Sequence, residues 1–430
     1  MVTRRFFDQI SKTGLFTPPQ PQTPGPFVLS LVQKEDGYPS PFLSGGINDL
    51  DAAVKGALSY NIPQLIEWKI TNGQQFLSFV QGMLNWIPSE NVQGKEIYWV
   101  LCLFYFVLDQ GSLGTQQTTI DPSAIVDGLP QMSALSTWIV QFAQQMGTFA
   151  DNPVSLTANS FQTFELSPYF NVSEAVLDLS DPQGKGGFSC FNKLFSRKLE
   201  TGTRPIWQPD DDTQIVFPAD STFDDFFPVD SDSLVTIKNV HLKISDLLVG
   251  SAHALDFAGG VWMHAFLGPS DYHRQHAPVA GTVVVSFNIQ GLAYLNVIAE
   301  EQDDGTHDLI TVRGFDAPDN PGYEFMQLRG CIIIDNPTLG LVAVLPIGMA
   351  QVSSVVRTVN PGDTVTKGQE ISYFQFGGSD IVVVFQQKAN VTFTATPSRV
   401  GPNGEADYYP GEHGQVGHLL AVAKPISPEK

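Results

Sequence analysis

The sequence contains few cysteines and lacks the apolar core of a signal peptide near its N-terminus. Only Cys102, Cys190 and Cys331 occur among 430 residues. They lie far apart, one of them is necessarily unpaired, and no C-x-x-C spacing is present, which disfavours a zinc site or a dithiol redox site. A reducing compartment fits this cysteine content, and the first residues disfavour secretion. We therefore expect a cytoplasmic location.

Basic residues and long apolar runs are also scarce. The chain has 23 Lys and Arg against 44 Asp and Glu, a formal net charge of −21. Because nucleic acids and anionic bilayers attract clustered Lys and Arg, this balance disfavours both as partners. The longest apolar run, residues 97–108, is well short of the roughly 20 residues that cross a bilayer. We interpret it as a buried helix and expect no stable membrane insertion.

Residues 48–150 have the periodicity of helices. Between Phe76 and Leu84, apolar residues recur on one helix face, and Pro88 follows shortly after. A second amphipathic helix is predicted over residues 133–146, where apolar residues repeat every three to four positions. The sequence therefore predicts a helical N-terminal unit.

After residue 205 the pattern changes to short β-branched and aromatic runs, such as 281–289 and 340–348, separated by Gly, Pro, Asn and Asp. A chain of this length also exceeds the size at which one core usually stops growing. We predict an α+β protein with an N-terminal extension (1–47), a helical accessory domain (48–150), a connecting segment (151–205) and a β-rich domain (206–430).

The stretch 359–371, VNPGDTVTKGQEI, has turn residues on either side of two short alternating runs, which predicts a hairpin-like turn system. Together with residues 276–283 it resembles the lipoyl and biotinyl carrier domains, whose strands form a flattened barrel. A carrier needs an exposed lysine at a hairpin tip. Lys367 lies inside the turn pattern instead, which argues against a carrier function.

A possible self-cleavage site lies in 374-FQFGGSD. Gly377 and Gly378 restrict the backbone little and tolerate unusual angles, so the Ser379 hydroxyl can reach the Gly378 carbonyl. That attack gives an ester, β-elimination leaves a dehydroalanine, and hydrolysis leaves a pyruvoyl group on the new chain. A neutral hydroxyl is a poor nucleophile, so an adjacent base with an orienting partner is required.

The segments 217-FPADS, 271-DYHRQHAPVAGTV and 374-FQFGGSD resemble, in type and order, the phosphatidylserine decarboxylases and their soluble amino-acid decarboxylase relatives. The segment 188-FSCFNKLFSRKLETGTRPI adds to this likeness, which covers roughly residues 185 to 390. The resemblance implies a β-rich catalytic domain of barrel-sandwich character. It also implies cleavage between Gly378 and Ser379, and a pyruvoyl cofactor made from Ser379 with no external cofactor.

The same resemblance implies roles for individual residues. It places the base for self-cleavage at His276, oriented by Asp220, so that Asp220, His276 and Ser379 form a triad. It assigns His273 to decarboxylation or to reprotonation of the resulting carbanion. For the substrate pocket we expect two aromatic residues, Phe374 and Phe376. The cleaved chains are expected to remain associated, with a homo-oligomer as a further possibility.

Two positions depart from the family pattern, which usually has Gly where Ser221 stands and Thr or Ser where Asp380 stands. Ser221 is a small change. Asp380 places a carboxylate beside the cleaved bond, where it could disfavour the developing oxyanion or accept a proton during elimination. His273 and His276 could also bind a metal, but no third ligand cluster stands out, and we expect none.

Three hypotheses for function remain open. The helical unit, with 84-LNWIP and 104-FYFVLD, resembles the extra domain of the fungal tryptophan decarboxylase-like branch, which favours a free aromatic or hydrophobic amino acid as substrate. The acidic charge agrees, because an enzyme acting on phosphatidylserine must approach an anionic bilayer. Phosphatidylserine is the alternative substrate. An unprocessed binding or structural relative is the alternative from another class, with Asp380 as its support.

Overall fold

The computed structural model describes residues 16–33, 40–91, 93–237, 239–311, 322–350, 354–376, 378–401 and 404–426. The chain divides into two compact units. The helical unit comprises Met1–Thr118, Met132–Leu199 and Leu295–Thr311, and the sheet unit comprises Thr119–Gln131, Glu200–Tyr294 and Val312–Lys430. The predicted ranges did not anticipate that Thr119–Gln131 joins the sheet unit or that Leu295–Thr311 joins the helical unit.

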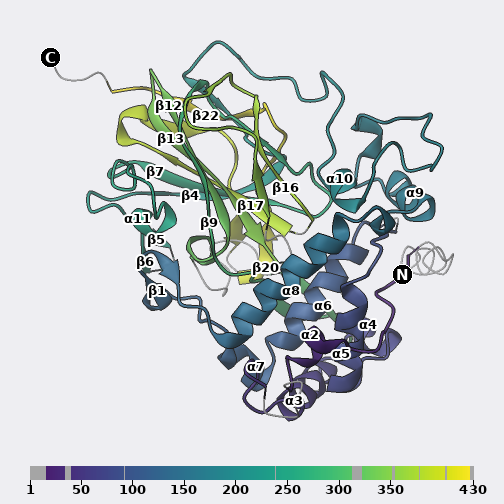
Figure 1. Cartoon of the computed structure of the whole chain (residues 1–430). Coiled ribbons are helices and arrows are strands. Elements are labelled where there is room, and N and C mark those ends of the chain that lie inside the picture. Colours follow the sequence, from purple (N-terminus) through teal and green to yellow (C-terminus); the bar gives the residue numbers. More distant parts are fainter. Residues whose placement is uncertain are drawn as a thin grey trace. The chain divides into compact units, whose positions relative to one another are not determined.

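The helical unit is built around three helices that the sequence pattern indicates (Figure 1). Its described elements are α2 (Pro26–Leu29), α3 (Ile47–Leu58), α4 (Pro63–Glu67), α5 (Gly73–Met83), α6 (Glu96–Leu108), α7 (Gly111–Gln116), α8 (Ala134–Ala150), η2 (Pro153–Ser155), α9 (Ala158–Leu166), η3 (Val172–Glu174), α10 (Phe191–Phe195), β10 (Val297–Glu301) and β11 (His307–Thr311). Helices α5 and α8 confirm the two predicted helices.

The ends of α5 and α8 follow from their caps. Asn72 accepts a hydrogen bond from the Gln75 backbone N–H, and Ser133 accepts one from the Ser136 backbone N–H. Such side chains satisfy backbone donors that have no partner within a helix. Helix α6 is almost wholly buried, as its apolar composition predicts. No helix in the described part of the chain is both long and apolar enough to span a membrane.

Stacked aromatic rings form much of the core of the helical unit. Trp138 of α8 stacks on Phe142 at 5.4 Å between ring centroids, Phe142 stacks on Phe104 of α6 at 4.7 Å, and Phe104 stacks on Phe76 of α5 at 6.3 Å. Each ring removes a large apolar area from water, and parallel offset pairs add a further attraction. The three helices are therefore joined through one continuous set of rings.

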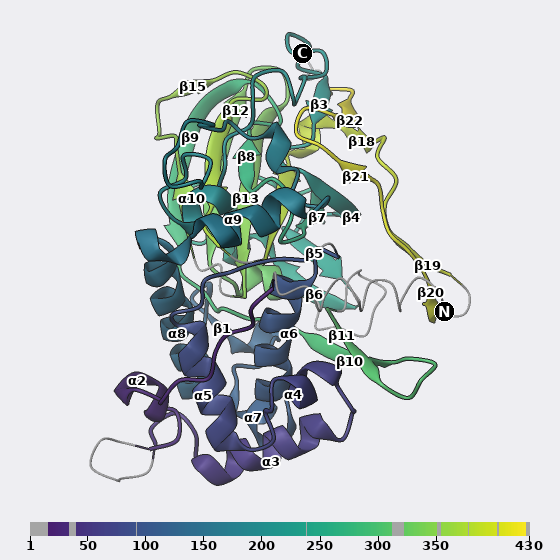
Figure 2. The ribbon, with the colours of Figure 1, turned by 90° about the vertical axis from the view of Figure 1, so that its right-hand side faces the viewer.

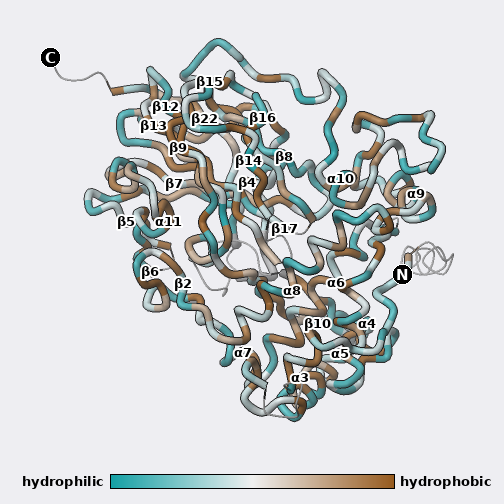
Figure 3. Tube along the Cα trace, in the orientation of Figure 1, coloured by the Kyte–Doolittle hydropathy of each residue, from teal (hydrophilic) through white to brown (hydrophobic). Residues whose placement is uncertain are grey.

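The sheet unit contains an eight-stranded antiparallel sheet with strand order β15-β9-β12-β13-β17-β7-β4-β21. Its strands are β4 (Ser221–Pro228), β7 (Val261–Leu267), β9 (Gly281–Ile289), β12 (Arg329–Asn336), β13 (Gly340–Met349), β15 (Thr364–Val365), β17 (Gly378–Phe385) and β21 (His413–Gly414). Nearly continuous apolar runs in β12 and β13 suit central strands, because both of their faces are buried. Figure 3 shows hydrophobic residues concentrated along these strands.

Smaller sheets complete this unit, with orders β14-β16-β8, β18-β22-β3, β19-β20, β5-β6 and β1-β2. Their strands are β1 (Ile125–Val126), β2 (Leu129–Pro130), β3 (Gln214–Val216), β5 (Leu234–Ile237), β6 (Val240–Lys243), β8 (Arg274–His276), β14 (Val355–Arg357), β16 (Glu370–Phe374), β18 (Val391–Phe393), β19 (Arg399–Gly401), β20 (Gly404–Tyr409) and β22 (Leu419–Ala423). The helical elements are η1 (Pro122–Ala124), α11 (Ile244–Leu247), η4 (Tyr323–Phe325) and η5 (Gln387–Ala389).

Two sheets of this unit lie against each other. The Asn288 side chain on β9 donates a hydrogen bond to the Val355 carbonyl of β14 at 2.8 Å, and Arg357 of β14 donates to the Ser286 carbonyl of β9 at 2.7 Å. The large sheet curls, as Figure 2 shows for β9, β12 and β13. The chain is therefore an α+β protein, as predicted, and its large antiparallel sheet is curled.

The hairpin predicted over residues 359–371 is wrong. Strand β15 pairs with β9, whereas β16 pairs with β14 and β8, so the two short strands belong to different sheets. The turns themselves are present, with positive φ at Gly362 and Gly368. Turn residues fix where the chain reverses, but they do not decide which neighbour each strand then pairs with.

Candidate active site

Ser379 lies near the start of β17, inside the large sheet. It is opposite Gly348 of β13 on one side and Leu267 of β7 on the other. Gly378 is the first residue of the strand, opposite Met349, and Gly377 lies outside the described residues. The Ser379 side chain is fully buried. The Gly378–Ser379 bond is therefore held in a regular ladder between two neighbouring strands.

His273 faces Ser379. Its Nδ1 lies 3.3 Å from the Ser379 Oγ, and its Nε2 lies 3.3 Å from the Pro269 carbonyl oxygen. A carbonyl oxygen can only accept, so the Nε2 atom carries the proton and the unprotonated Nδ1 points at the hydroxyl. Both side chains are fully buried. This is the arrangement in which an imidazole can take the proton of an attacking hydroxyl.

His276 contacts other groups. Its Nδ1 lies 2.7 Å from the Gly368 carbonyl oxygen, and its Nε2 lies 3.1 Å from the Tyr272 hydroxyl oxygen. Nδ1 therefore donates to the carbonyl, and Nε2 accepts from the phenol. Burial lowers the pKa of His276, with opposition from the hydrogen bond to Gly368. A neutral ring in this position joins the segment containing β8 to the turn before β16.

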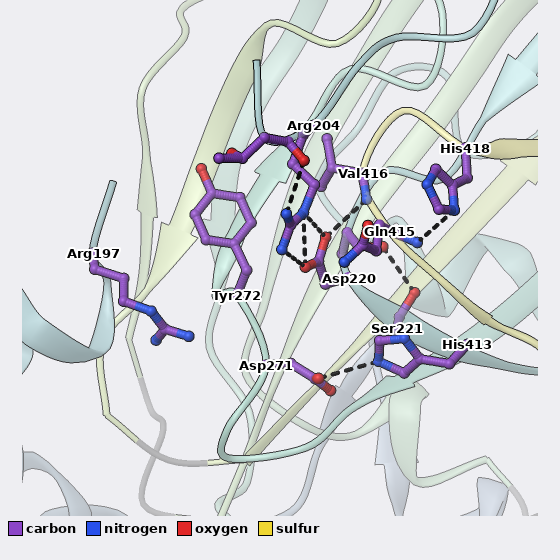
Figure 4. Close-up of polar contacts among 12 residues, drawn as sticks. Arg197, Arg204, Asp220, Ser221, Asp271, Tyr272, His413, Gln415, Val416 and His418 are labelled. Atoms are coloured by element: carbon purple, nitrogen blue, oxygen red, sulfur yellow. Dashed lines mark hydrogen bonds and ion pairs between the residues drawn. The ribbon is translucent and has the colours of Figure 1, made fainter. Parts of the chain in front are cut away.

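Asp220 pairs with Arg204. The guanidinium donates to both carboxylate oxygens, with distances of 3.0 Å from Nε and 2.6 Å from Nη2, and the Val416 backbone N–H donates to Asp220 Oδ1 at 2.8 Å (Figure 4). The guanidinium also lies over the Tyr272 ring at 5.9 Å. Asp220 thus joins the segments of Arg204 and Val416, which lie 16 and 196 residues away in the sequence.

The structure therefore does not assemble the predicted triad of Asp220, His276 and Ser379. Among the described residues, no hydrogen bond joins any two of these three side chains. The histidine beside the Ser379 hydroxyl is His273. His276 contacts Tyr272 and Gly368 instead. Asp220 contacts Arg204 and the Val416 backbone.

Comparison with known proteins gives the family. A sequence profile described as phosphatidylserine decarboxylase matches residues 191–406, which is half of the 430-residue chain. The chain belongs to the phosphatidylserine decarboxylase family.

Curated relatives agree with this family. The chain is 31% identical over 248 residues to phosphatidylserine decarboxylase proenzyme 3 of Schizosaccharomyces pombe, covering 58% of this chain and 23% of that protein. It is 32% identical over 214 residues to decarboxylase iboD of Amanita muscaria, covering 48% and 61%. It is 34% identical over 200 residues to a phosphatidylserine decarboxylase proenzyme of Chlamydia trachomatis, covering 46% and 60%. The chain thus spans less than two thirds of the length of each of these relatives.

The two predicted pocket residues of this decarboxylase-family chain are both buried. Phe374 lies edge-on to the His273 ring at 6.4 Å between centroids, and its backbone N–H donates to the His273 carbonyl at 2.9 Å. Phe376 is 4% exposed. Phe374 therefore packs directly beside the histidine that faces Ser379.

The two departures from the usual family pattern have different surroundings. Ser221 is buried and donates to the Ala219 carbonyl at 3.1 Å, a local contact that a hydroxyl makes easily. Asp380 is fully buried, and its Oδ2 lies 3.5 Å from the Nε2 of His264 on β7. Sequence reasoning missed His264, because a single histidine in the apolar run VWMHAFL carries no motif. The signal in the sequence was Asp380, an acidic residue in an apolar strand, which needs a partner of opposite charge.

The structure gives one observation on metal binding and one on the carrier alternative. Among the described residues, no group of three or more His, Cys, Asp or Glu side chains has the geometry of a metal site. Lys367 is 4% exposed, and its Nζ donates to the carbonyls of Gln208 at 2.7 Å and Asp211 at 2.6 Å. A lysine held in this way is not presented for modification as a carrier lysine must be.

Proposed function

We propose that this chain cuts itself between Gly378 and Ser379 and then acts as a pyruvoyl-dependent decarboxylase of a free amino acid, with an aromatic or hydrophobic side chain preferred. The observation that carries the proposal is the pair of buried groups Ser379 and His273, with His273 Nδ1 3.3 Å from the hydroxyl oxygen. Membership in the family and relatives named as proenzymes support it.

The cut proceeds through an ester. His273 Nδ1 takes the hydroxyl proton as the Ser379 Oγ attacks the Gly378 carbonyl carbon. The C–N bond then breaks, and the amine of residue 379 takes up a proton. Loss of the residue 379 Cα proton expels the Gly378 carboxylate and leaves a dehydroalanine. One water then releases ammonia and leaves the ketone on the chain that begins at residue 379.

The ketone supplies an electron sink that accepts a substrate amine and draws electrons from the bond to the carboxylate. The residues around it have defined tasks in this proposal. His273 takes and returns protons beside residue 379, as the ring is the one imidazole in contact with it among the described residues. His276, Tyr272 and Arg204 hold the β8 segment in place.

The role of base moves from His276 to His273 in this proposal. His276 keeps a supporting role, because its Nδ1 proton is committed to Gly368 and its Nε2 lone pair to Tyr272. Asp220 likewise has a supporting role, because Arg204 occupies its carboxylate. A base must first lie within reach of the proton that it removes, and His273 meets that condition.

Intact-mass analysis of matched variants tests the cut. Wild type is expected as two fragments, the later one beginning with a ketone, and Ser379→Ala is expected as one chain. His273→Gln keeps a donor toward Pro269 but cannot take up a proton, so cutting should slow by about 10²- to 10⁴-fold. His276→Asn keeps a donor toward Gly368 and should slow cutting by less than about tenfold. The reverse order would overturn the assignment of His273.

The proposed substrate preference rests on the charge of the chain and on the resemblance of the helical unit to the extra domain of the fungal tryptophan decarboxylase-like branch. The net charge of −21 opposes approach to an anionic bilayer. One relative is named only as a decarboxylase, whereas others carry phosphatidylserine in their names. Carbon dioxide release should therefore be measured with tryptophan, other amino acids and phosphatidylserine vesicles. Release from the lipid alone would reverse the proposed preference.

A non-catalytic relative is the remaining alternative. Borohydride added with a candidate amine reduces and traps the adduct only on a chain that carries a ketone. A folded wild-type chain that stays whole and traps no amine would favour a binding or structural module.

A further inference from the structure

Asp380 and Ser379 are consecutive in strand β17, so their side chains point to opposite faces of the sheet. Ser379 faces His273. Asp380 faces the other side, on the same face as Val382 and Val384, which belong to a buried apolar cluster of the sheet unit. A fully buried carboxylate at this position is costly without a partner of opposite charge.

His264 supplies that partner. It lies on β7, where Val382 is its direct neighbour across the ladder. Its Nε2 is 3.5 Å from Asp380 Oδ2, and its Nδ1 is 2.7 Å from Asp224 Oδ2 on β4. The ring also stacks on Trp262 at 6.0 Å between centroids. Three neighbouring strands therefore contribute to one buried contact.

Two further groups face the same ring nitrogen. The Tyr323 hydroxyl lies 3.4 Å from His264 Nε2, and Glu324 Oε1 lies 3.9 Å from it. Burial lowers the pKa of His264, but the Asp380 and Asp224 carboxylates outweigh burial and raise it well above its ordinary value. Burial also raises the pKa of Asp380, and the nearby His264 opposes that rise.

The position of this contact matters once the chain has been cut. Before cutting, Ser379 is tethered on both sides by the chain. After cutting, residue 379 is a chain end, and chain ends open more readily than strand interiors. Asp380 is the first residue beyond that end, and its carboxylate is the nearest charged anchor within β17.

We propose that Asp224, His264 and Asp380 form a clasp on the far face of β17 that holds the newly cut chain end in the ladder, so that the ketone formed from Ser379 stays opposite His273. Asp224 orients His264, and His264 holds Asp380. This inference rests on the proposed self-cleavage. All three are positioning residues, because their side chains act through the strand.

A role for Asp380 as the base in elimination fits the geometry less well. The proton to be removed lies on the Cα of residue 379, whereas the Asp380 carboxylate points into the core on the opposite face from the Ser379 side chain. His273 already lies on the Ser379 side. Loss of the clasp should therefore change the rate of cutting little, and it should loosen β17 in the chain that has been cut.

Hydrogen exchange of the β17 amides tests the clasp without relying on enzyme activity. Asp380→Asn is compared in two full-length backgrounds, wild type, which cuts itself, and Ser379→Ala, which stays whole. In the cut chain the substitution should raise exchange across residues 380–385 by at least about tenfold. In the whole chain it should raise exchange by less than about threefold. An equal rise in both backgrounds would show a purely structural contact and overturn the proposal.

Matched variants separate the outcomes. Asp256→Asn is the control, because it removes an exposed aspartate that contacts a histidine, His253, at 2.7 Å, and it should change nothing. His264→Gln keeps a neutral donor near Asp380 and should give an intermediate effect; it also serves if Asp380→Asn does not fold. In the cut Asp380→Asn chain, kcat for decarboxylation should fall by about tenfold, whereas KM should stay nearly unchanged.

Loss of cutting in a folded Asp380→Asn chain would also overturn the proposal, because Asp380 would then be needed for the cut itself rather than after it. Failure of the proposed function has a separate signature. In that case the wild-type chain itself stays whole, whatever the variants do.

Discussion

The pair Arg204 and Asp220 gives the sharpest test of how the site is built. Asp220→Asn keeps the size of the side chain and one acceptor, but it removes the charge that faces the guanidinium. The side chains are 9% and 5% exposed and lie 2.6 Å apart at their closest. Breaking a buried pair from one side costs about 3–5 kcal/mol, because the remaining charge is left without a partner. Since Asn retains an acceptor, we expect a loss of about 3 kcal/mol.

The second substitution decides what that loss means. Arg204→Met in the same chain removes the stranded guanidinium, so the double variant should lie within about 1 kcal/mol of wild type. The unfolding free energy is measured in the Ser379→Ala background, from hydrogen exchange of the β4 and β7 amides against urea, so that cutting does not enter. A coupling energy below about 1 kcal/mol would refute a buried, tightly held pair.

Cutting is then followed in the same variants with Ser379 present. If Asp220 acts only by holding Arg204 and the Val416 backbone, the double variant should recover cutting as it recovers stability. A double variant that is stable and yet stays whole would refute this reasoning. It would return Asp220 to the direct role that the family resemblance implied.

Three further predictions follow from buried groups and strand order. Burial raises the pKa of Glu90 from 4.5 to about 7 and that of Glu96 from 4.5 to about 8. The folded helical unit therefore holds these protons more tightly than the unfolded chain, and its unfolding free energy should fall as the pH rises from about 5 to about 8. The loss is at most about 1.4 kcal/mol per pH unit for each group. Glu90→Gln should flatten that profile, measured by tryptophan fluorescence; an unchanged profile contradicts it. Residues 379–430 supply β17, which lies between β13 and β7, and β22, which pairs with β3, so the cut fragments should co-elute in native gel filtration and separate only in denaturant. Tyr272→Phe removes the hydroxyl that donates to His276 and should cost about 1 kcal/mol of unfolding free energy while cutting stays within about tenfold; a complete block of cutting would contradict a supporting role.

The parts of the fold that the sequence predicted are those set by local signals. The positions of α5 and α8 follow from apolar spacing and from the capping residues Asn72 and Ser133. Strands β12 and β13 follow from their apolar runs. Pairing across the sheets is a long-range property, and the wrong hairpin over 359–371 shows its limit. The hairpin of β10 and β11 likewise lies with the helical unit, although its neighbours in sequence belong to the sheet unit.

The candidate site likewise has residues that motifs identify and contacts that only the fold creates. Ser379 and the two histidines could be selected from motifs, but the partner of Asp380 could not, because His264 becomes close only through the pairing of β17 with β7. Arg204 could be selected from the Arg-Pro of its segment, yet its pairing with Asp220 depends on the fold. Contacts between distant segments therefore account for most of what was missed.

The proposed move of the base from His276 to His273 has a physical basis in the spacing of the two residues. The two residues are three apart, and in an extended segment residues at an odd spacing point to opposite faces. Only one of them can then face Ser379. The register of β8 on β16 places His276 opposite Glu370, and the Phe374 backbone N–H holds the His273 carbonyl. His273 is thereby turned toward Ser379 and His276 toward Gly368, so any mechanism that requires both rings at the Ser379 hydroxyl also requires β8 to leave its ladder.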